Sequence, residues 1–114
     1  MSSDTGELLQ GTLAILILKA LLAGPTHGFG LARWVEQTTD DVLRIEEGSL
    51  YPALRRVEDK GWVTSEWGLS ENNRRARFYT ITTAGRAHVR SEAAVWLRYA
   101  AAVTRVLRAA PALA

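Results

Sequence analysis

The stretch from Glu46 to Trp62 constrains the fold most, because it combines helical periodicity with a start signal and a stop signal. On a helix of about 3.6 residues per turn, one face carries three aliphatic side chains: Leu50, Leu54 and Val57. The opposite face carries Pro52, Arg55, Arg56 and Asp59. A helix tolerates proline in its first turn, so this one is expected to begin near Gly48 or Ser49. Gly61 is expected to end it.

This short helix has two possible uses. Its size and its two adjacent arginines fit the major groove of DNA; the alternative is an ordinary amphipathic helix with a solvated basic face. The charge distribution bears on the choice. Residues 1–48 hold three bases and seven acids, a net charge of −4, whereas residues 49–114 hold eleven bases and five acids, a net charge of +6. A basic half that begins at this helix indicates a nucleic-acid partner.

Length and composition predict one domain without a cofactor. The 114 residues suffice for a single core, and the absence of cysteine excludes disulfides and thiolate metal sites. The N-terminal MSSDTGE has no cationic region of the kind that opens a signal peptide. The apolar run from Leu13 to Ala23 is shorter than the roughly 20 residues that span a bilayer. We therefore expect a cytoplasmic protein with no membrane partner.

The residues before Glu46 predict two further helices. Leu9–Leu22 carries a broad apolar surface, and Gly24-Pro25 ends it. A helix that is apolar around most of its circumference is buried on several sides, and one of these can belong to a second subunit. The THGFG segment, residues 26–30, then forms a tight connection into a helix over Gly28–Gln37. Together with the helix after Glu46, this order is a helix-turn-helix plan.

The residues after Trp62 predict a β-hairpin. Residues 62–67 alternate, with Val63 and Trp67 on one side, and residues 76–82 form a second β-rich run. The turn between them, GLSENNR, contains Asn72-Asn73, which suits left-handed backbone conformations. The tip and the returning strand carry Asn73, Arg74, Arg75 and Arg77. Such a basic tip favours contacts with phosphates or the minor groove; the alternative is a surface ribbon whose arginines only solvate it.

The last helix is expected to run from a cap at Thr82 or Thr83 to about Ala109. Along it, residues spaced alternately four and three apart form a heptad seam: Val89, Ala93, Trp96, Ala100, Val103 and Leu107. The helix could pack on its own domain, but a seam this long favours a homodimer formed with the first helix. The expected fold is mainly α with a small β-hairpin. A winged helix-turn-helix domain covers residues 8–82, and a C-terminal dimerisation helix covers residues 83–110 of the same compact unit.

Enzyme functions find little support in the sequence. The two histidines, His27 and His88, are far apart and have no cysteine with which to complete a usual zinc site. There is no phosphate-binding or dinucleotide-binding glycine motif. Ser49 has no evident base, and Glu46-Glu47 is explained by its place at a helix entrance. The competing hypothesis is a winged helix that binds an acidic protein instead of specific DNA.

Five segments together resemble the PadR-like bacterial transcriptional regulators, specifically the short members with one C-terminal helix. They are LLQGTLAILILKAL, GPTHGFG, EEGSLYPALRRVEDKGWV, SENNRRARFYTITTAG and the terminal helix, over residues 8–108. The resemblance implies a homodimeric repressor that binds operator DNA and releases it when a small molecule binds.

By motif, the resemblance places Ser49, Tyr51, Pro52 and Arg55 in the groove helix, and Asn73, Arg74, Arg75 and Arg77 in the wing. Tyr51 has a second interpretation, as a partly buried aromatic that braces the start of the helix. The chain departs from the family at Phe29, where a tyrosine is usual. This removes a hydroxyl that could reach a phosphate.

Trp96 is the candidate ligand contact. It lies on the seam between Ala93 and Ala100, so two indoles near a two-fold axis could border a flat slot suited to a planar aromatic effector. The resemblance points the same way, because some short PadR-like regulators hold flat drugs at the dimer centre. Trp96 could instead simply fill the interface or pack on the first helix. The predicted interface and ligand set is Leu13, Leu16, Val89, Ala93, Trp96, Ala100 and Val103.

Overall fold

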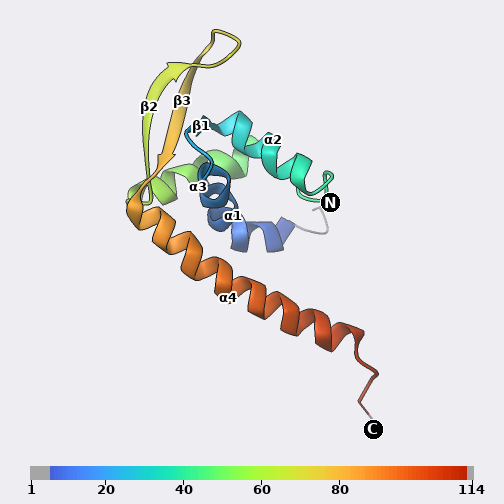
Figure 1. Cartoon of the computed structure of the whole chain (residues 1–114). Coiled ribbons are helices and arrows are strands. Elements are labelled where there is room, and N and C mark those ends of the chain that lie inside the picture. Colours follow the sequence, from blue (N-terminus) through green and yellow to red (C-terminus); the bar gives the residue numbers. More distant parts are fainter. Residues whose placement is uncertain (1–5, 113–114) are drawn as a thin grey trace.

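The computed structural model describes residues 6–112 (Figure 1). Residues 1–5, and with them most of the acidic N-terminal stretch, lie outside this range, as do residues 113–114. The order of elements is α1 (Gly6–Leu21), β1 (Thr26–His27), α2 (Gly28–Thr38), α3 (Glu47–Asp59), β2 (Val63–Leu69), β3 (Arg75–Ile81) and α4 (Thr83–Arg108). All four predicted helices are present. The fold is mainly helical, with a small antiparallel sheet.

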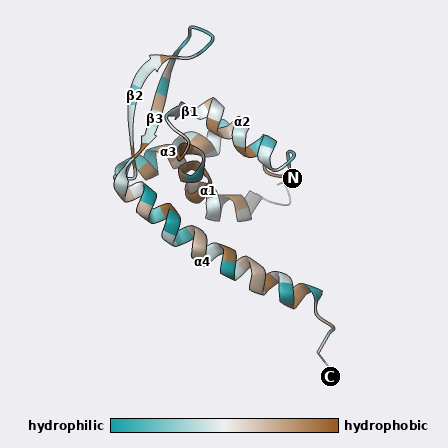
Figure 2. Cartoon of the chain, viewed as in Figure 1, coloured by the Kyte–Doolittle hydropathy of each residue, from teal (hydrophilic) through white to brown (hydrophobic). Residues whose placement is uncertain are grey.

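Helix α1 lies at the centre of the core, as its broad apolar surface predicts. Its Leu13, Ile17, Leu18 and Leu21 are at most 2 % exposed, and Figure 2 shows strongly hydrophobic ribbon at this central helix. Side chains from α2, α3 and the sheet complete the core around them, including Leu31, Val35, Leu54, Val57, Val63 and Ile81. Burying an aliphatic side chain of this size contributes about 1.5–3 kcal/mol. The core therefore fixes how α3 and the hairpin lie on α1.

Helix α3 begins slightly earlier than its proline predicts. Its first residue is Glu47, so Pro52 is the sixth residue and lies beyond the first turn. Pro52 has no N–H to donate to the carbonyl of Gly48, but Gly48 is exposed and water can take that place. The inward face is as predicted, with Leu50, Leu54 and Val57 buried. Gly61 ends the segment with φ +78°, a left-handed conformation that favours glycine.

The wing sheet has three strands, whereas the sequence predicts a two-stranded hairpin. Its order is β1-β3-β2, because Thr26 and His27, predicted as part of a tight connection, pair with Tyr79 and Phe78 of β3. Strand β2 also runs on to Leu69, two residues past its predicted end, and pairs there with Arg75. The turn follows the prediction at Asn73, whose φ is 60°.

The junction between the wing and α4 is closed by Thr82 and Gly85. Thr82 is the predicted N-cap, and its hydroxyl oxygen accepts a hydrogen bond from the Gly85 N–H at 3.0 Å. The same hydroxyl donates to the carbonyl of Gly61 at 2.7 Å, so one side chain joins both ends of the hairpin to the helix. A Cβ atom at Gly85 would collide with the carbonyl oxygen of Trp62 and lie 2.8 Å from Ile81. The helix can approach the hairpin this closely only with glycine there.

Helix α4 packs on α1 through its first turns and then extends away from the rest of the chain (Figure 1). Val89 is buried, and every side chain from Ala101 to Arg108 is exposed. None of the helices in residues 6–112 is both long and apolar enough to cross a membrane.

The close contact at Gly85 gives a first prediction. Alanine favours helix over glycine by about 1 kcal/mol, but at Gly85 its methyl group would force the Trp62 carbonyl aside. We expect Gly85→Ala to lower the free energy of unfolding by about 1–3 kcal/mol, measured by urea unfolding. In the control Gly48→Ala, the added methyl meets nothing within 4 Å, and we expect unchanged or slightly higher stability. A Gly85→Ala protein as stable as the parent would contradict this account of the junction.

Candidate nucleic-acid interface

The outward face of α3 carries the residues predicted to enter a DNA groove. Tyr51, Pro52, Arg55 and Arg56 are exposed, and Ser49 near the start of the helix is half-buried. They point outward because Leu50, Ala53, Leu54 and Val57 are held in the core on the other side. The helix thus presents a rigid, solvent-facing surface with two adjacent guanidinium groups.

The position of Tyr51 is compatible with both of its predicted roles, bracing the start of α3 and contacting DNA. Its ring lies against the backbone of Gly28 at the start of α2: a Cβ atom there would be 3.0 Å from the Tyr51 hydroxyl. The ring therefore braces two helices against each other. The side chain is nevertheless 46 % exposed, so it remains accessible to a ligand on the outer face of α3.

The wing carries its arginines over an exposed tryptophan. The guanidinium carbons of Arg75 and Arg77 lie 4.7 Å and 5.5 Å from the centre of the Trp67 ring, which is 55 % exposed. Both distances fall within the range of cation–π attraction. Arg77 and Trp67 are directly opposite each other in the β2–β3 register. Arg74 precedes β3 at the exposed tip, where its backbone N–H donates to the hydroxyl oxygen of Ser70 at 3.3 Å.

Arg77 is also tied to α3 through a serine. Its Nε–H donates to the hydroxyl oxygen of Ser65 at 2.9 Å, and that hydroxyl donates to a carboxylate oxygen of Glu58 at 2.6 Å. Glu58 belongs to the last turn of α3, and Ser65 to β2. We call this chain of two hydrogen bonds the Glu58–Ser65–Arg77 relay. It connects α3 with the wing.

Tyr79 lies where α3, β1 and the wing meet. Burial raises the pKa of its hydroxyl, and the positive charge of Arg77 partly offsets this; Glu58 and Tyr51 also raise the pKa, and Arg55 lowers it. These influences place residues of the α3 face and of the wing around one buried ring. The hydrogen bond from Ser65 of β2 to Glu58 of α3 sets these two predicted DNA-contacting elements side by side, with Tyr79 paired to Ser65 on the same face of the hairpin.

The two histidines have structural contacts. Nδ1 of His27 accepts a hydrogen bond from the Gly30 N–H at 3.1 Å and caps α2, while His88 stacks on Trp62 with ring centres 3.7 Å apart. Beside His27, Phe29 is 67 % exposed, with the Arg33 guanidinium 5.8 Å from its ring centre. Among residues 6–112, no cluster of three or more His, Asp or Glu side chains could hold a metal ion.

The predicted interface and ligand residues divide into two groups. Leu13 and Val89 are only 2 % and 3 % exposed, so they belong mainly to this chain's own core. The other five keep accessible surface: Leu16, Ala93, Trp96, Ala100 and Val103. The seam on α4 therefore begins, as a free surface, at Ala93.

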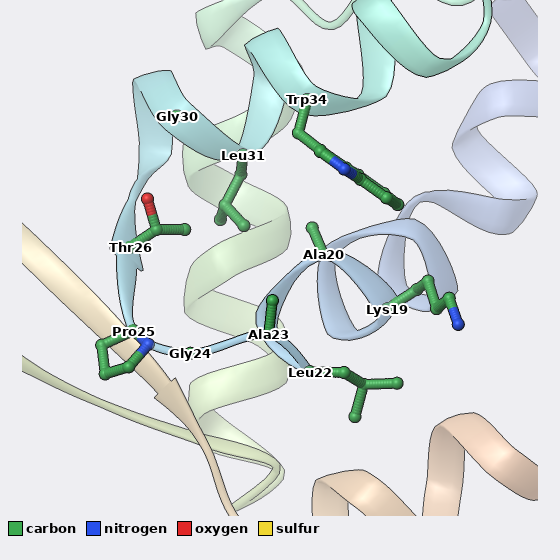
Figure 3. A pocket seen from close by; sticks show the side chains of 10 residues that line it. All are labelled: Lys19, Ala20, Leu22, Ala23, Gly24, Pro25, Thr26, Gly30, Leu31 and Trp34. Atoms are coloured by element: carbon green, nitrogen blue, oxygen red, sulfur yellow. The ribbon is translucent and has the colours of Figure 1, made fainter.

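Two surface pockets flank the end of α1. One of about 450 Å³ lies between α1 and α2 and is shown in Figure 3, where the Trp34 indole extends over Ala20. The other, about 330 Å³, lies between α1 and α4, where Leu22, Val89 and Ala93 are joined by three cationic side chains: Lys19, Arg86 and Arg90. Ala93, one helical turn before Trp96, connects this second pocket with the seam.

Sequence reasoning did not identify Glu58 and Ser65, and it placed Trp67 only by its alternation. The alternation of side chains along a strand could have indicated part of this, because Ser65 and Trp67 lie on the same strand face as Val63. The sequence does not give the register of the two strands. In the structure, Arg77 lies opposite Trp67 and two residues from Tyr79, the partner of Ser65.

A groove-sized helix with a basic outer face, joined to an arginine-bearing hairpin, defines the class of winged helix-turn-helix proteins. The sequence model of the family described as "Transcriptional regulator PadR-like family" matches residues 17–91, and the chain belongs to this family. Its members are transcriptional regulators that bind DNA, and they are not enzymes.

Solved structures agree with this assignment. A transcriptional regulator from Clostridium thermocellum is 25 % identical, with a TM-score of 0.77 over 87 % of this chain and 96 % of its own. A PadR family transcriptional regulator from Eggerthella lenta is 31 % identical, with a TM-score of 0.72 over 91 % of this chain and 88 % of its own. A relative matched by sequence, an uncharacterised protein from Lysinibacillus sphaericus, is 23 % identical over 90 residues, which are 79 % of this chain and 83 % of the relative.

Proposed function

We propose that this protein is a homodimeric repressor that acts in the cytoplasm, binds a pseudo-palindromic operator and leaves it when a small aromatic ligand binds. The observation that carries the proposal is the contact between α3 and the Trp67 face of the wing, made by the hydrogen bonds of the Glu58–Ser65–Arg77 relay. The guanidinium groups of Arg75 and Arg77 lie over Trp67 on the wing, and Arg55 is exposed on α3. Such a surface suits a groove with phosphates on its edge.

The DNA contacts follow from where each side chain lies. On α3, Ser49, Tyr51, Pro52, Arg55 and Arg56 would face the major groove, and Arg55 is the residue proposed to read a base edge. On the wing, Asn73, Arg74, Arg75 and Arg77 would contact the backbone or the minor groove. Phe29 can offer only ring contacts, because it lacks a hydroxyl.

Base contacts and phosphate contacts should respond differently to substitution. Arg55→Ala is expected to cost roughly 1–3 kcal/mol on the operator and much less on random DNA. Arg74→Ala should weaken both about equally and reduce the salt dependence of binding by about one ion. Fluorescence polarisation with a duplex from the region upstream of its own gene, at several salt concentrations, measures both. Equal losses on both DNAs for Arg55→Ala would make Arg55 a backbone contact.

The dimer is proposed from the unpartnered seam on α4. Within the described chain, Val103 is 37 % and Leu107 78 % exposed although both continue the heptad line of Val89. Apolar residues at this spacing favour association with another helix. A two-fold dimer presents two α3 helices, so its operator requires two half-sites about one helical turn, or a multiple of it, apart.

Charges on the seam should separate the protomers without unfolding them. Val103→Glu with Leu107→Glu places two carboxylates where the partner helix would pack, and neither residue belongs to the protomer core. We expect a folded monomer by sedimentation and circular dichroism, with no specific operator binding. Ala102→Glu, on the opposite side of α4, is the control and should remain dimeric. A dimer that survives both seam substitutions would place the interface elsewhere.

The effector is proposed to contact Trp96. Its indole is 44 % exposed between the small side chains of Ala93 and Ala100, which leaves room beside the ring. Offset stacking of a planar ligand adds roughly 0.5–1.5 kcal/mol per aromatic pair. An inserted ligand would change the angle between the two α4 helices and so the spacing of the two α3 helices. The cationic pocket that ends at Ala93 makes acidic aromatic compounds the first to test.

Trp96→Ala tests the ligand role once dimerisation and operator binding are confirmed for the variant. Planar aromatic compounds that release the parent from DNA should release the variant only at clearly higher concentration, because the stacking surface is gone. The measurement is a titration of the preformed DNA complex. An unchanged response would make Trp96 an ordinary interface residue.

A further inference from the structure

Two members of the Glu58–Ser65–Arg77 relay, Glu58 and Ser65, make none of the DNA contacts proposed so far. We infer that the relay, together with Trp67, holds the Arg75 and Arg77 guanidinium groups ready to bind backbone phosphate beside the groove that α3 enters. Glu58, Ser65 and Trp67 are then positioning residues for DNA binding, although only the arginines touch the DNA. This inference rests on the proposed function and names how its wing contacts are prepared.

The hydrogen bonds of the relay can run in only one direction. A carboxylate only accepts and a guanidinium only donates, so the single proton of the Ser65 hydroxyl goes to Glu58 and its oxygen accepts from Arg77. Both bonds involve a charged group and are therefore of the stronger kind. They use only Nε–H of Arg77. The four N–H donors at the far end of the guanidinium are left for a phosphate.

Stacking on Trp67 leaves the same donors free. Arg75 and Arg77 approach the face of the indole, whereas the N–H groups of a guanidinium point outward in its own plane. The strand register supports the arrangement, because Ser65, Trp67, Arg77 and Arg75 all project from one face of the hairpin. Two like charges on one ring repel each other, and an anion bound between them relieves that repulsion.

Apart from its hydrogen bond to Ser65, Glu58 lies where a negative charge is unfavourable. It is an acid in the last turn of α3, where the helix dipole disfavours negative charge, and it lies next to a surface proposed to bind polyanionic DNA. Asp59 shares both disadvantages but is exposed and makes no hydrogen bond through its side chain within the described chain. Glu58 and Asp59 therefore form a matched pair in which only Glu58 holds the relay.

The matched pair gives a test that depends on sign. If Glu58 were only a surface acid, Glu58→Ala would tighten DNA binding by removing repulsion. The inference predicts the opposite, a loss of about three- to tenfold, because Arg77 must then be ordered when DNA binds. Asp59→Ala and Glu58→Gln should bind as tightly as the parent or tighter, since the first leaves the relay intact and the second keeps an acceptor for Ser65.

A second series separates positioning from general damage to the wing. Ser65→Ala should weaken binding by the same factor as Glu58→Ala, and Ser65→Thr, which keeps the hydroxyl, should restore it. In an Arg77→Ala background, Glu58→Ala and Ser65→Ala should cause no further loss, because the side chain they position is absent. Trp67→Ala should weaken binding, and Trp67→Phe, which keeps a ring face, should do so less.

The experiment is fluorescence polarisation with one duplex at fixed salt for the full chain and each variant, with urea unfolding as the check on folding. The expected result is weaker binding for Glu58→Ala and Ser65→Ala only where Arg77 is present. A parent that binds no duplex would overturn the proposed function itself. A parent that binds, with Glu58→Ala and Ser65→Ala as tight as the parent or with losses that persist without Arg77, would overturn this inference alone.

Discussion

Burial of one face of α3 is the constraint on which the rest of the structure depends. Leu50, Ala53, Leu54 and Val57 are held against α1 and the foot of the wing, and this fixes the rotation of the helix about its axis. Arg55 and Arg56 are exposed for that reason alone. The proposed DNA-binding face of α3 thus follows from hydrophobic burial on the opposite side of the same helix, which is worth far more than any contact the arginines make within the chain.

The wing is joined to this frame at its base and along strand β2. At its base, the Thr82 hydroxyl links the start of α4 with Gly61, and Gly85 lets the helix lie against the Trp62 carbonyl. In the third residue of β2, the Ser65 hydroxyl links the hairpin with Glu58 of α3. A hairpin alone is marginally stable in water; these links and the pairing with β1 give it a defined direction relative to α3.

Local patterns in the sequence predicted the elements well, and the differences have physical causes. The helices follow from apolar spacing and caps, and Asn73 from its tolerance of positive φ. Strand β1 could not be predicted, because two residues after a Gly-Pro turn carry no periodicity and become a strand only by pairing with β3. Periodicity marks apolar faces without saying which chain covers them, so it places Leu13 and Val89 on an interface although this chain itself buries both. The sequence does not predict the contact between Glu58 and Ser65, because this contact depends on how the hairpin lies on α3.

The central claim is that α3 and the wing bind DNA as one surface, while α4 serves the dimer. The most direct measurement is a titration of isotope-labelled protein with a duplex from the region upstream of its own gene, followed by NMR. We expect shifted backbone signals along α3, at the start of α2 and from Trp67 to Arg77, with the exposed end of α4 unaffected. Shifts centred on α4, or none on α3 and the wing, would contradict the account.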